Sequence, residues 1–227
     1  SLACVGLCGA SWALGWVSQP PPLLWSAAGL AWVLGGSLLL HRGVAGWSDV
    51  PVGVRVPGGL LALWLAWLAV AQARFIGVNF LLSILVLVWV ADIFAYFAGR
   101  AFGGRFSRGK LAPSISPGKS WEGVWGGMAG VVVLAFAWLW ADRWLGAGVA
   151  SFYTRLSSHG IVVLLIAVLF MAAMSVVGDL VESLIKRSAG VKDSSGLLPG
   201  HGGVLDRVDA LLPTLPLAMM LATLGRP

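Results

Sequence analysis

Long apolar runs dominate this chain and decide which folds are open to it. Runs of about 16–24 apolar residues recur along the 227 positions, and that length crosses a bilayer core as a helix. Lipid offers no hydrogen bonds to an exposed backbone, so such runs must form helices that bond internally. Short segments of alternating polarity, which would indicate a β-barrel, do not occur. We therefore expect an all-α fold, a polytopic transmembrane helical bundle.

The order of apolar and polar segments predicts about seven spans. These lie near residues 2–17, 23–40, 58–73, 80–98, 121–140, 161–184 and 211–224. The segments between them, above all 41–57, 99–120, 141–160 and 185–209, are expected to be loops. We divide the chain into N-terminal transmembrane helices (1–75) and a catalytic transmembrane region (76–227) with cytoplasmic loops 99–120 and 185–209. Because the chain enters an apolar run at its first residues, we expect the natural protein to extend further upstream.

Basic residues are distributed unevenly between the loops. Alternate loops hold eleven of the fifteen Lys and Arg side chains, and the opposite side holds four. The positive-inside rule then orients the basic loops toward the cytoplasm, in an inner cell membrane. The net charge of +6 suits an anionic membrane surface and anionic substrates, and no nucleic acid is expected as a partner.

The stretch from Ser183 to Asp209 stands out from the apolar background. The chain is 59% hydrophobic and 11% charged, yet this stretch concentrates lysines, arginines and aspartates among glycines. A solvated basic loop explains the cations. It does not explain the carboxylates or the Gly-His-Gly-Gly turn beside them, so the stretch is interpreted as a reaction site.

Carboxylates recur at a spacing of three residues on both sides of this stretch. Asp179 and Glu182 share one helix face that continues to Lys186, although Glu182 and Lys186 alone would make a helix-end ion pair. Asp206 and Asp209 repeat the spacing where a helix dipole would favour them in any case. Several acids at one membrane face nevertheless need cations, and hard oxygen ligands suit Mg²⁺, which completes its shell with water and substrate phosphates.

Two further features suggest anion binding, and a third is an acid within a span. The glycines around His201 free backbone N–H groups to face an anion, while His201 itself has three open roles: phosphate contact, acid–base group or turn residue. Ser114 to Ser120 places hydroxyls and Lys119 before a helix N-terminus, although Ser120 would also serve as a plain N-cap. Asp92 lies inside a predicted span, where acids usually serve function or form a buried pair.

The residues of this stretch resemble a known signature. SLIKRSAGVKDSSGLLPGHGGVLDRVD, which begins at Ser183, is similar position for position to the signature of the phosphatidate cytidylyltransferases (CDP-diacylglycerol synthases). WVADIFAYFAGRAFG from Trp89, SPGKSWEG from Ser116 and GDLVESLIKR from Gly178 support the resemblance, which covers the C-terminal two-thirds of the chain.

The resemblance implies an integral membrane enzyme that joins CTP and phosphatidate into CDP-diacylglycerol and pyrophosphate, with Mg²⁺ as cofactor, working as a homodimer. Carried over to this sequence, it makes Asp179 and Asp206 the metal ligands. The catalytic set becomes Asp179, Asp206, Lys192 and His201. The substrate-binding set becomes Ser114, Ser116, Lys119, Glu122, Lys186, Arg187, Asp193, Gly202, Gly203, Arg207 and Asp92.

Two alternatives remain at this stage. A related enzyme could act on another lipid phosphate with the same nucleotide, because the sequence says little about lipid tails. An ion-coupled transporter would also place acids inside spans, but it would show two related halves with broken helices. Charge here gathers at one end, and no such symmetry is evident.

Overall fold

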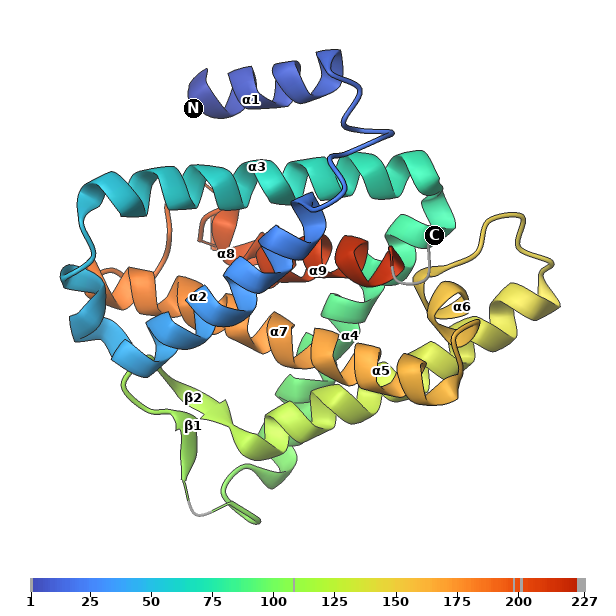
Figure 1. Cartoon of the computed structure of the whole chain (residues 1–227). Helices are drawn as coiled ribbons and strands as arrows, with labels where there is room; N and C mark the ends of the chain where they lie inside the picture. Colours follow the sequence, from blue (N-terminus) through green and yellow to red (C-terminus); the bar gives the residue numbers. More distant parts are fainter. Residues whose placement is uncertain (1, 108, 198, 201, 224–227) are drawn as a thin grey trace.

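Helices account for most of the computed structural model, which describes residues 2–107, 109–197, 199–200 and 202–223 (Figure 1). By length and composition, five helices in these ranges are suited to crossing a membrane: α2 (Leu24–Ser48), α3 (Val52–Ile76), α4 (Val78–Phe102), α5 (Trp121–Trp144) and α7 (Ile161–Ser188). The expected helical membrane bundle is therefore confirmed. Seven spans are not, because α1 (Leu2–Ala13) and α9 (Leu211–Ala222) have 12 residues each, about 18 Å of helix.

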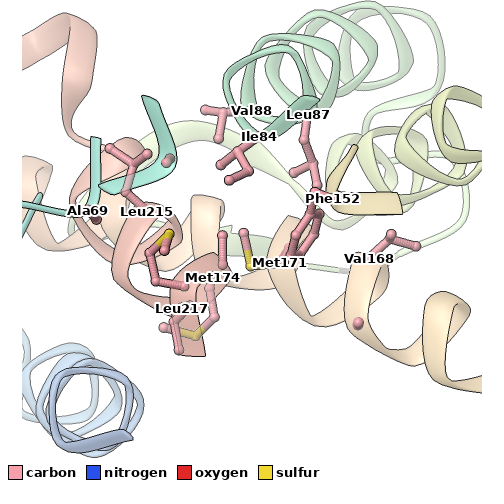
Figure 2. Close-up of a cluster of buried hydrophobic side chains, with 14 of the residues drawn as sticks. Ala69, Ile84, Leu87, Val88, Phe152, Val168, Met171, Met174, Leu215 and Leu217 are labelled. Carbon is pink, nitrogen blue, oxygen red and sulfur yellow. The ribbon is translucent and has the colours of Figure 1, made fainter. Parts of the chain in front are cut away.

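The short helix α9 lies in the interior of the bundle. Its residues from Pro213 to Met219 are all buried, and α9 contacts α2, α3 and α7. Figure 2 shows side chains from α4, α7 and α9 converging, with Met171 and Met174 of α7 near Leu217 of α9. Gly178 makes room for this arrangement, since a Cβ there would lie 2.7 Å from the Asp209 carbonyl oxygen. Gly178 therefore allows the backbone at Asp209 to pack directly against α7.

Glycines allow α4 and α5 to pack closely. A Cβ on Gly127 of α5 would lie 2.8 Å from the Ala91 carbonyl oxygen of α4, and one on Gly123 would lie 3.0 Å from the Ala95 carbonyl oxygen. Gly126 and Gly130 likewise have no space for a side chain, against Ala98 and Phe94 respectively. Small residues at four-residue spacing let membrane helices approach each other in this way.

The expected loop over 41–57 is wrong. Helix α2 continues through it to Ser48 after a kink at Gly43 (φ 68°, ψ −168°), and α3 begins at Val52. Gly43 bends the chain without ending the helix, because glycine adopts this conformation without a Cβ clash. Pro57 lies in the second turn of α3, where the lost backbone hydrogen bond does not terminate the helix. Short connectors, 49–51 and Gly77, join α2 to α3 and α3 to α4.

The segment 141–160 is also more ordered than expected. It contains the short helix α6 (Phe152–Ser157), whose Phe152, Tyr153 and Leu156 are buried. Asp142 accepts a hydrogen bond of 2.6 Å from the Thr154 hydroxyl and one of 2.9 Å from the Asn79 amide. These bonds attach the segment to the start of α4, so it is part of the core at that end of the bundle.

A β-hairpin interrupts the expected loop over 99–120. Strand β1 (Lys110–Ala112) pairs antiparallel with β2 (Ser116–Ser120), and Lys110 lies opposite Ser120. Ile115 in the turn is buried with Leu180 and Leu184 of α7. The hairpin therefore packs against the C-terminal half of α7, because Ile115, with Leu111 and Ala112 beside it, anchors an otherwise polar loop. The one-turn helix α8 (Leu205–Val208) follows α7 and precedes α9.

Candidate functional site

The C-terminal end of α7 carries a compact group of charges. The Lys186 ammonium lies 2.5 Å from the Glu182 carboxylate and 2.6 Å from the Asp206 carboxylate. The helix-end pair between Glu182 and Lys186 is thereby confirmed. Glu182 is 5% exposed, so Lys186 neutralises a carboxylate that is otherwise costly to bury. Lys186 consequently joins α7 to α8 in addition to carrying positive charge.

Asp206 organises the loop that precedes it. Its carboxylate accepts hydrogen bonds from the Ser194 backbone N–H (2.9 Å), the Ser194 hydroxyl (2.8 Å) and the Gly203 backbone N–H (2.6 Å). Burial alone would raise the pKa of Asp206, but the hydrogen bonds from Lys186, Ser194 and Gly203 together hold that pKa below its usual range. Asp206 is therefore ionised near neutral pH, and both of its carboxylate oxygens accept hydrogen bonds.

Glycines are required where the loop folds over Asp206. Gly202 has φ 77°, and a Cβ there would lie 2.9 Å from an Asp206 carboxylate oxygen. A Cβ on Gly203 would overlap the Ser194 hydroxyl and lie 2.9 Å from the Ser195 backbone nitrogen. The two predicted glycines thus let the loop close around Asp206. The Gly203 N–H, which the sequence suggested could face an anion, donates instead to the Asp206 carboxylate.

Lys119 connects the hairpin to α7. Its ammonium forms an ion pair with the Asp179 carboxylate, which also accepts a hydrogen bond of 3.3 Å from the Ser183 hydroxyl. The hairpin, within the expected 99–120 loop, therefore meets the end of α7, just before the expected 185–209 loop. Ser120 is the N-cap of α5, since its hydroxyl accepts the Gly123 N–H at 3.2 Å.

A cavity of about 450 Å³ opens between α4, α5, α7 and β2. Its charged lining consists of Asp92, Arg100, Lys119 and Asp179. The rest of its wall is mostly small or apolar, with Tyr96 as the aromatic contribution; it includes Ala91, Ala95, Gly127, Met128, Ala172 and Val176. Asp92, placed by sequence in a span, thus faces the same space as Asp179.

Asp209 belongs near this cavity, although the sequence analysis did not include it among the site residues. Burial raises the pKa of Asp209 to about 6, and the Asp179 carboxylate adds to the rise. Its three-residue spacing from Asp206 was the available signal. The carboxylates of Asp206 and Asp209 lie in different surroundings: Asp206 accepts hydrogen bonds from Lys186, Ser194 and Gly203, whereas Asp209 accepts one from the Ala210 backbone N–H.

A second hollow, of about 430 Å³, lies within the loop after α7. Predicted site residues line it, namely Lys192, Asp193, Gly202 and Arg207, together with Ser195, Gly196, Pro199 and Gly200. The lining is polar and glycine-rich, so backbone N–H groups and two cations surround one space. His201, predicted as catalytic, lies outside the described residues.

Other predicted residues lie away from both spaces. Ser114 is exposed in the hairpin turn, and Ser116 begins β2. Arg187 donates from Nε to the Ile115 carbonyl at 3.4 Å. Glu122 is 3% exposed, and one of its oxygens accepts from the Phe106 and Ser107 backbone N–H groups at 3.1 and 2.8 Å. In this structure Glu122 therefore orders the segment after α4.

The donors available for a metal are carboxylate oxygens. In the described ranges no three His, Cys, Asp or Glu side chains gather closely enough to hold an ion on their own. Asp179 faces the cavity and is balanced by Lys119. This arrangement fits a cation such as Mg²⁺, which takes one or two carboxylates and completes its shell with water and phosphates.

Comparison with known proteins gives a consistent result. The chain matches the model of the cytidylyltransferase family over residues 7–224. It is 49% identical to the phosphatidate cytidylyltransferase of Haemophilus influenzae over 140 residues. This matched segment is 62% of this chain and 44% of that protein. It is 43% identical over 164 residues to the protein of that name from Pseudomonas aeruginosa, which covers 71% of this chain and 55% of the relative.

A third relative, from Thermotoga maritima, carries the same name and is 44% identical over 138 residues, 60% of this chain and 46% of that protein. The chain thus spans about half the length of the curated relatives it matches. The family match nevertheless extends over nearly the whole sequence, including both charged segments that meet at the end of α7. The chain belongs to the cytidylyltransferase family.

Proposed function

We propose that this protein transfers a cytidylyl group from CTP to phosphatidate and releases pyrophosphate, which makes CDP-diacylglycerol for phospholipid synthesis. One observation carries the proposal. Lys119 of the hairpin and Asp179 of α7 meet at a cavity whose other walls are apolar membrane helices. Such a space offers a charged end to phosphates and an apolar side to a lipid.

The proposed reaction is an in-line displacement at phosphorus. A phosphate oxygen of phosphatidate attacks the α-phosphorus of CTP, a new P–O–P bond forms, and the bond to the bridging oxygen of the leaving pyrophosphate breaks. The attacking monoester is already ionised near neutral pH, so no strong base is required. The enzyme would therefore accelerate the reaction by positioning the two substrates and neutralising the charge on their phosphates, as is usual in phosphoryl transfer.

The cations of the site have the task of holding phosphates. Lys119 at the cavity and Lys192 with Arg207 at the second hollow would bind phosphate oxygens. Lys186 would keep Asp206 and Glu182 in place. Bound Mg²⁺ would neutralise charge on the phosphates, with Asp179 and Asp206 as its proposed protein ligands. Asp206 would exchange one of its present hydrogen bonds for the metal.

The setting of the reaction is also proposed. Basic side chains gather at the end of α7 and in the loop after it, which favours a site facing the cytoplasm from the inner cell membrane. A homodimer is proposed from the family resemblance. The mass of the protein in detergent, measured by light scattering with the detergent contribution subtracted, tests that state directly.

An assay with labelled substrates tests the proposed function. Purified protein in detergent receives CTP labelled at the α-phosphorus, Mg²⁺ and phosphatidate, and both labelled CDP-lipid and pyrophosphate are followed. Asp179→Asn should abolish both products, while exposed Asp49→Asn, between α2 and α3, should leave them unchanged. No product with any phosphorylated lipid would overturn the enzyme assignment. Product with another lipid phosphate but not with phosphatidate would identify the related activity instead.

A further inference from the structure

The cavity between α4, α5 and α7 changes character along its length. Arg100 lies in the last turn of α4, near Lys119 and Ser120 at the hairpin end. Asp92 lies eight residues deeper in the same helix, about 12 Å along its axis. Small and apolar residues of α4, α5 and α7 form the walls over this depth, including Ala91, Ala95, Gly127 and Ala172. The end near the hairpin therefore carries Arg100 and the Lys119–Asp179 pair, Asp92 lies deeper, and the remaining wall is mostly small or apolar.

Arg100 differs from the neighbouring lysines in its contacts. Lys119 is paired with Asp179, and Lys186 is paired with two carboxylates. Over the described ranges Arg100 forms no ion pair, and its Nη1 donates a hydrogen bond of 3.0 Å to the Tyr96 hydroxyl. That bond occupies one N–H group of the guanidinium. The remaining N–H groups of the planar fork are suited to two oxygens of one phosphate.

The walls of the two spaces distinguish their ligands. The second hollow is lined by Lys192, Arg207 and a glycine-rich loop, which suits a soluble polyphosphate. The cavity is enclosed by helices of membrane-crossing length and has apolar walls beneath its cations. A nucleotide has no long acyl chain to extend along Ala91 and Ala172. A phosphate that carries acyl chains can pair with Arg100 and place its chains against the apolar walls.

We infer that Arg100 binds the phosphate of the lipid substrate in the cavity between α4, α5 and α7, with Tyr96 as its positioning residue. The inference rests on the proposed function for the identity of the reaction. Phosphatidate and soluble phosphates offer Arg100 the same phosphate group. They differ in the acyl chains, which only the lipid can place against the apolar walls. Arg100 thus selects the acceptor, while the loop after α7 receives the nucleotide.

Kinetics with each substrate varied separately test this assignment. In mixed micelles at saturating CTP, Arg100→Gln should raise the KM for phosphatidate at least tenfold and leave the KM for CTP within twofold. Arg100→Lys should recover part of the loss, because it keeps the charge without the fork. Tyr96→Phe should raise the lipid KM about threefold with little change in kcat. Arg105→Gln is the matched control, since Arg105 lies against Phe102 and does not line the cavity.

Equal effects on both KM values, or an unchanged lipid KM in Arg100→Gln, would overturn the inference. Tyr96→Phe gives a second measurement should Arg100→Gln fail to fold, which gel filtration in detergent reveals. An unchanged lipid KM in that variant would then remove the positioning role and the inference with it.

Direct binding separates the inference from the proposed function. Radiolabelled phosphatidate in mixed micelles should bind the wild-type protein without CTP, and Arg100→Gln should reduce that binding at least tenfold. Unlabelled phosphatidate should compete, whereas diacylglycerol, glycerol 3-phosphate and inorganic phosphate at equal concentration should not. Competition by the two soluble phosphates would overturn the lipid assignment. Arg100-dependent binding without any turnover would refute the proposed function and leave the inference standing.

Discussion

Asp206 shows how a single carboxylate can organise a loop that carries several candidate site residues. Its carboxylate accepts a hydrogen bond from Lys186 of α7 and further hydrogen bonds from backbone N–H groups of the glycine-rich loop. Hydrogen bonds to a charged group contribute about 1.5–3 kcal/mol each, so the loop depends strongly on this residue. A role in metal binding would add to this structural task.

Asp206→Asn should reduce turnover at least ~100-fold and lower the free energy of unfolding by about 1–3 kcal/mol. The amide keeps one acceptor but loses the charge that faces Lys186 and presents N–H groups toward other donors. Product formation and thermal unfolding in detergent measure the two effects, with Asp49→Asn as the control. Full activity at saturating Mg²⁺ would remove Asp206 from the metal site.

Glu122 is a second carboxylate that accepts backbone N–H groups, in this case from the segment after α4. Glu122→Ala should expose the chain around Arg105 to trypsin at least tenfold faster. The substitution leaves the Phe106 and Ser107 N–H groups without their acceptor, at a cost of about 1–3 kcal/mol. Glu122→Gln should give an intermediate rate. Cleavage rates measured by mass spectrometry decide the question, and an unchanged rate in Glu122→Ala would contradict it.

At the scale of the elements, the contact between α4 and α5 depends on glycines. Helices in a membrane gain little from hydrophobic burial against each other, so close packing is what holds them together. Gly127 also lines the cavity, as does Ala91 on the facing helix. The same close crossing that stabilises the pair therefore sets the width of the candidate substrate site.

Gly127→Val should lower the free energy of unfolding by about 1–3 kcal/mol, because its side chain would meet the Ala91 carbonyl and push the helices apart. Gly59→Val in α3 is the matched control, since a Cβ there meets no atom within 4 Å. Thermal unfolding followed by tryptophan fluorescence in detergent compares them. Equal midpoints for the two variants would show that the glycine contact contributes nothing.

At the scale of the whole molecule, the site joins segments far apart in the chain. One cavity is lined by Lys119 of the hairpin, Asp179 of α7 and Asp92 of α4. Helix α9 packs against α7 at Gly178, through Pro213. Asp179 is paired with Lys119, and within the described ranges no group of three or more metal-ligating side chains forms around it. Nucleotide phosphates would therefore be needed to complete the shell of a bound Mg²⁺.

Mg²⁺ and CTP together should raise the thermal midpoint by more than the sum of their separate shifts, because each ligand completes the site of the other. Removal of Mg²⁺ with EDTA should abolish turnover, and added Mg²⁺ should restore it. Differential scanning fluorimetry in detergent with Mg²⁺ alone, CTP alone and both measures the coupling. Additive shifts would mean that the metal and the nucleotide bind independently.

The sequence by itself determined the class of fold and the segments that matter. Apolar length indicated the membrane helices, and the run from Ser183 to Asp209 carried the family resemblance, because both signals are local along the chain. Glu182–Lys186 pairing and the Ser120 cap were also foreseeable, since helix spacing alone brings those groups together.

Only the tertiary structure decided what each charged group contacts. The sequence could not show that Lys119 reaches Asp179, that Glu122 turns toward the segment after α4, or that Arg100 faces a cavity. These contacts depend on how α4, α5 and α7 pack, and at glycine contacts such as Gly127 against Ala91 the helices approach too closely for a side chain to fit. Spacing along one helix predicts neighbours within a turn, whereas a site built from several helices exists only once they are packed.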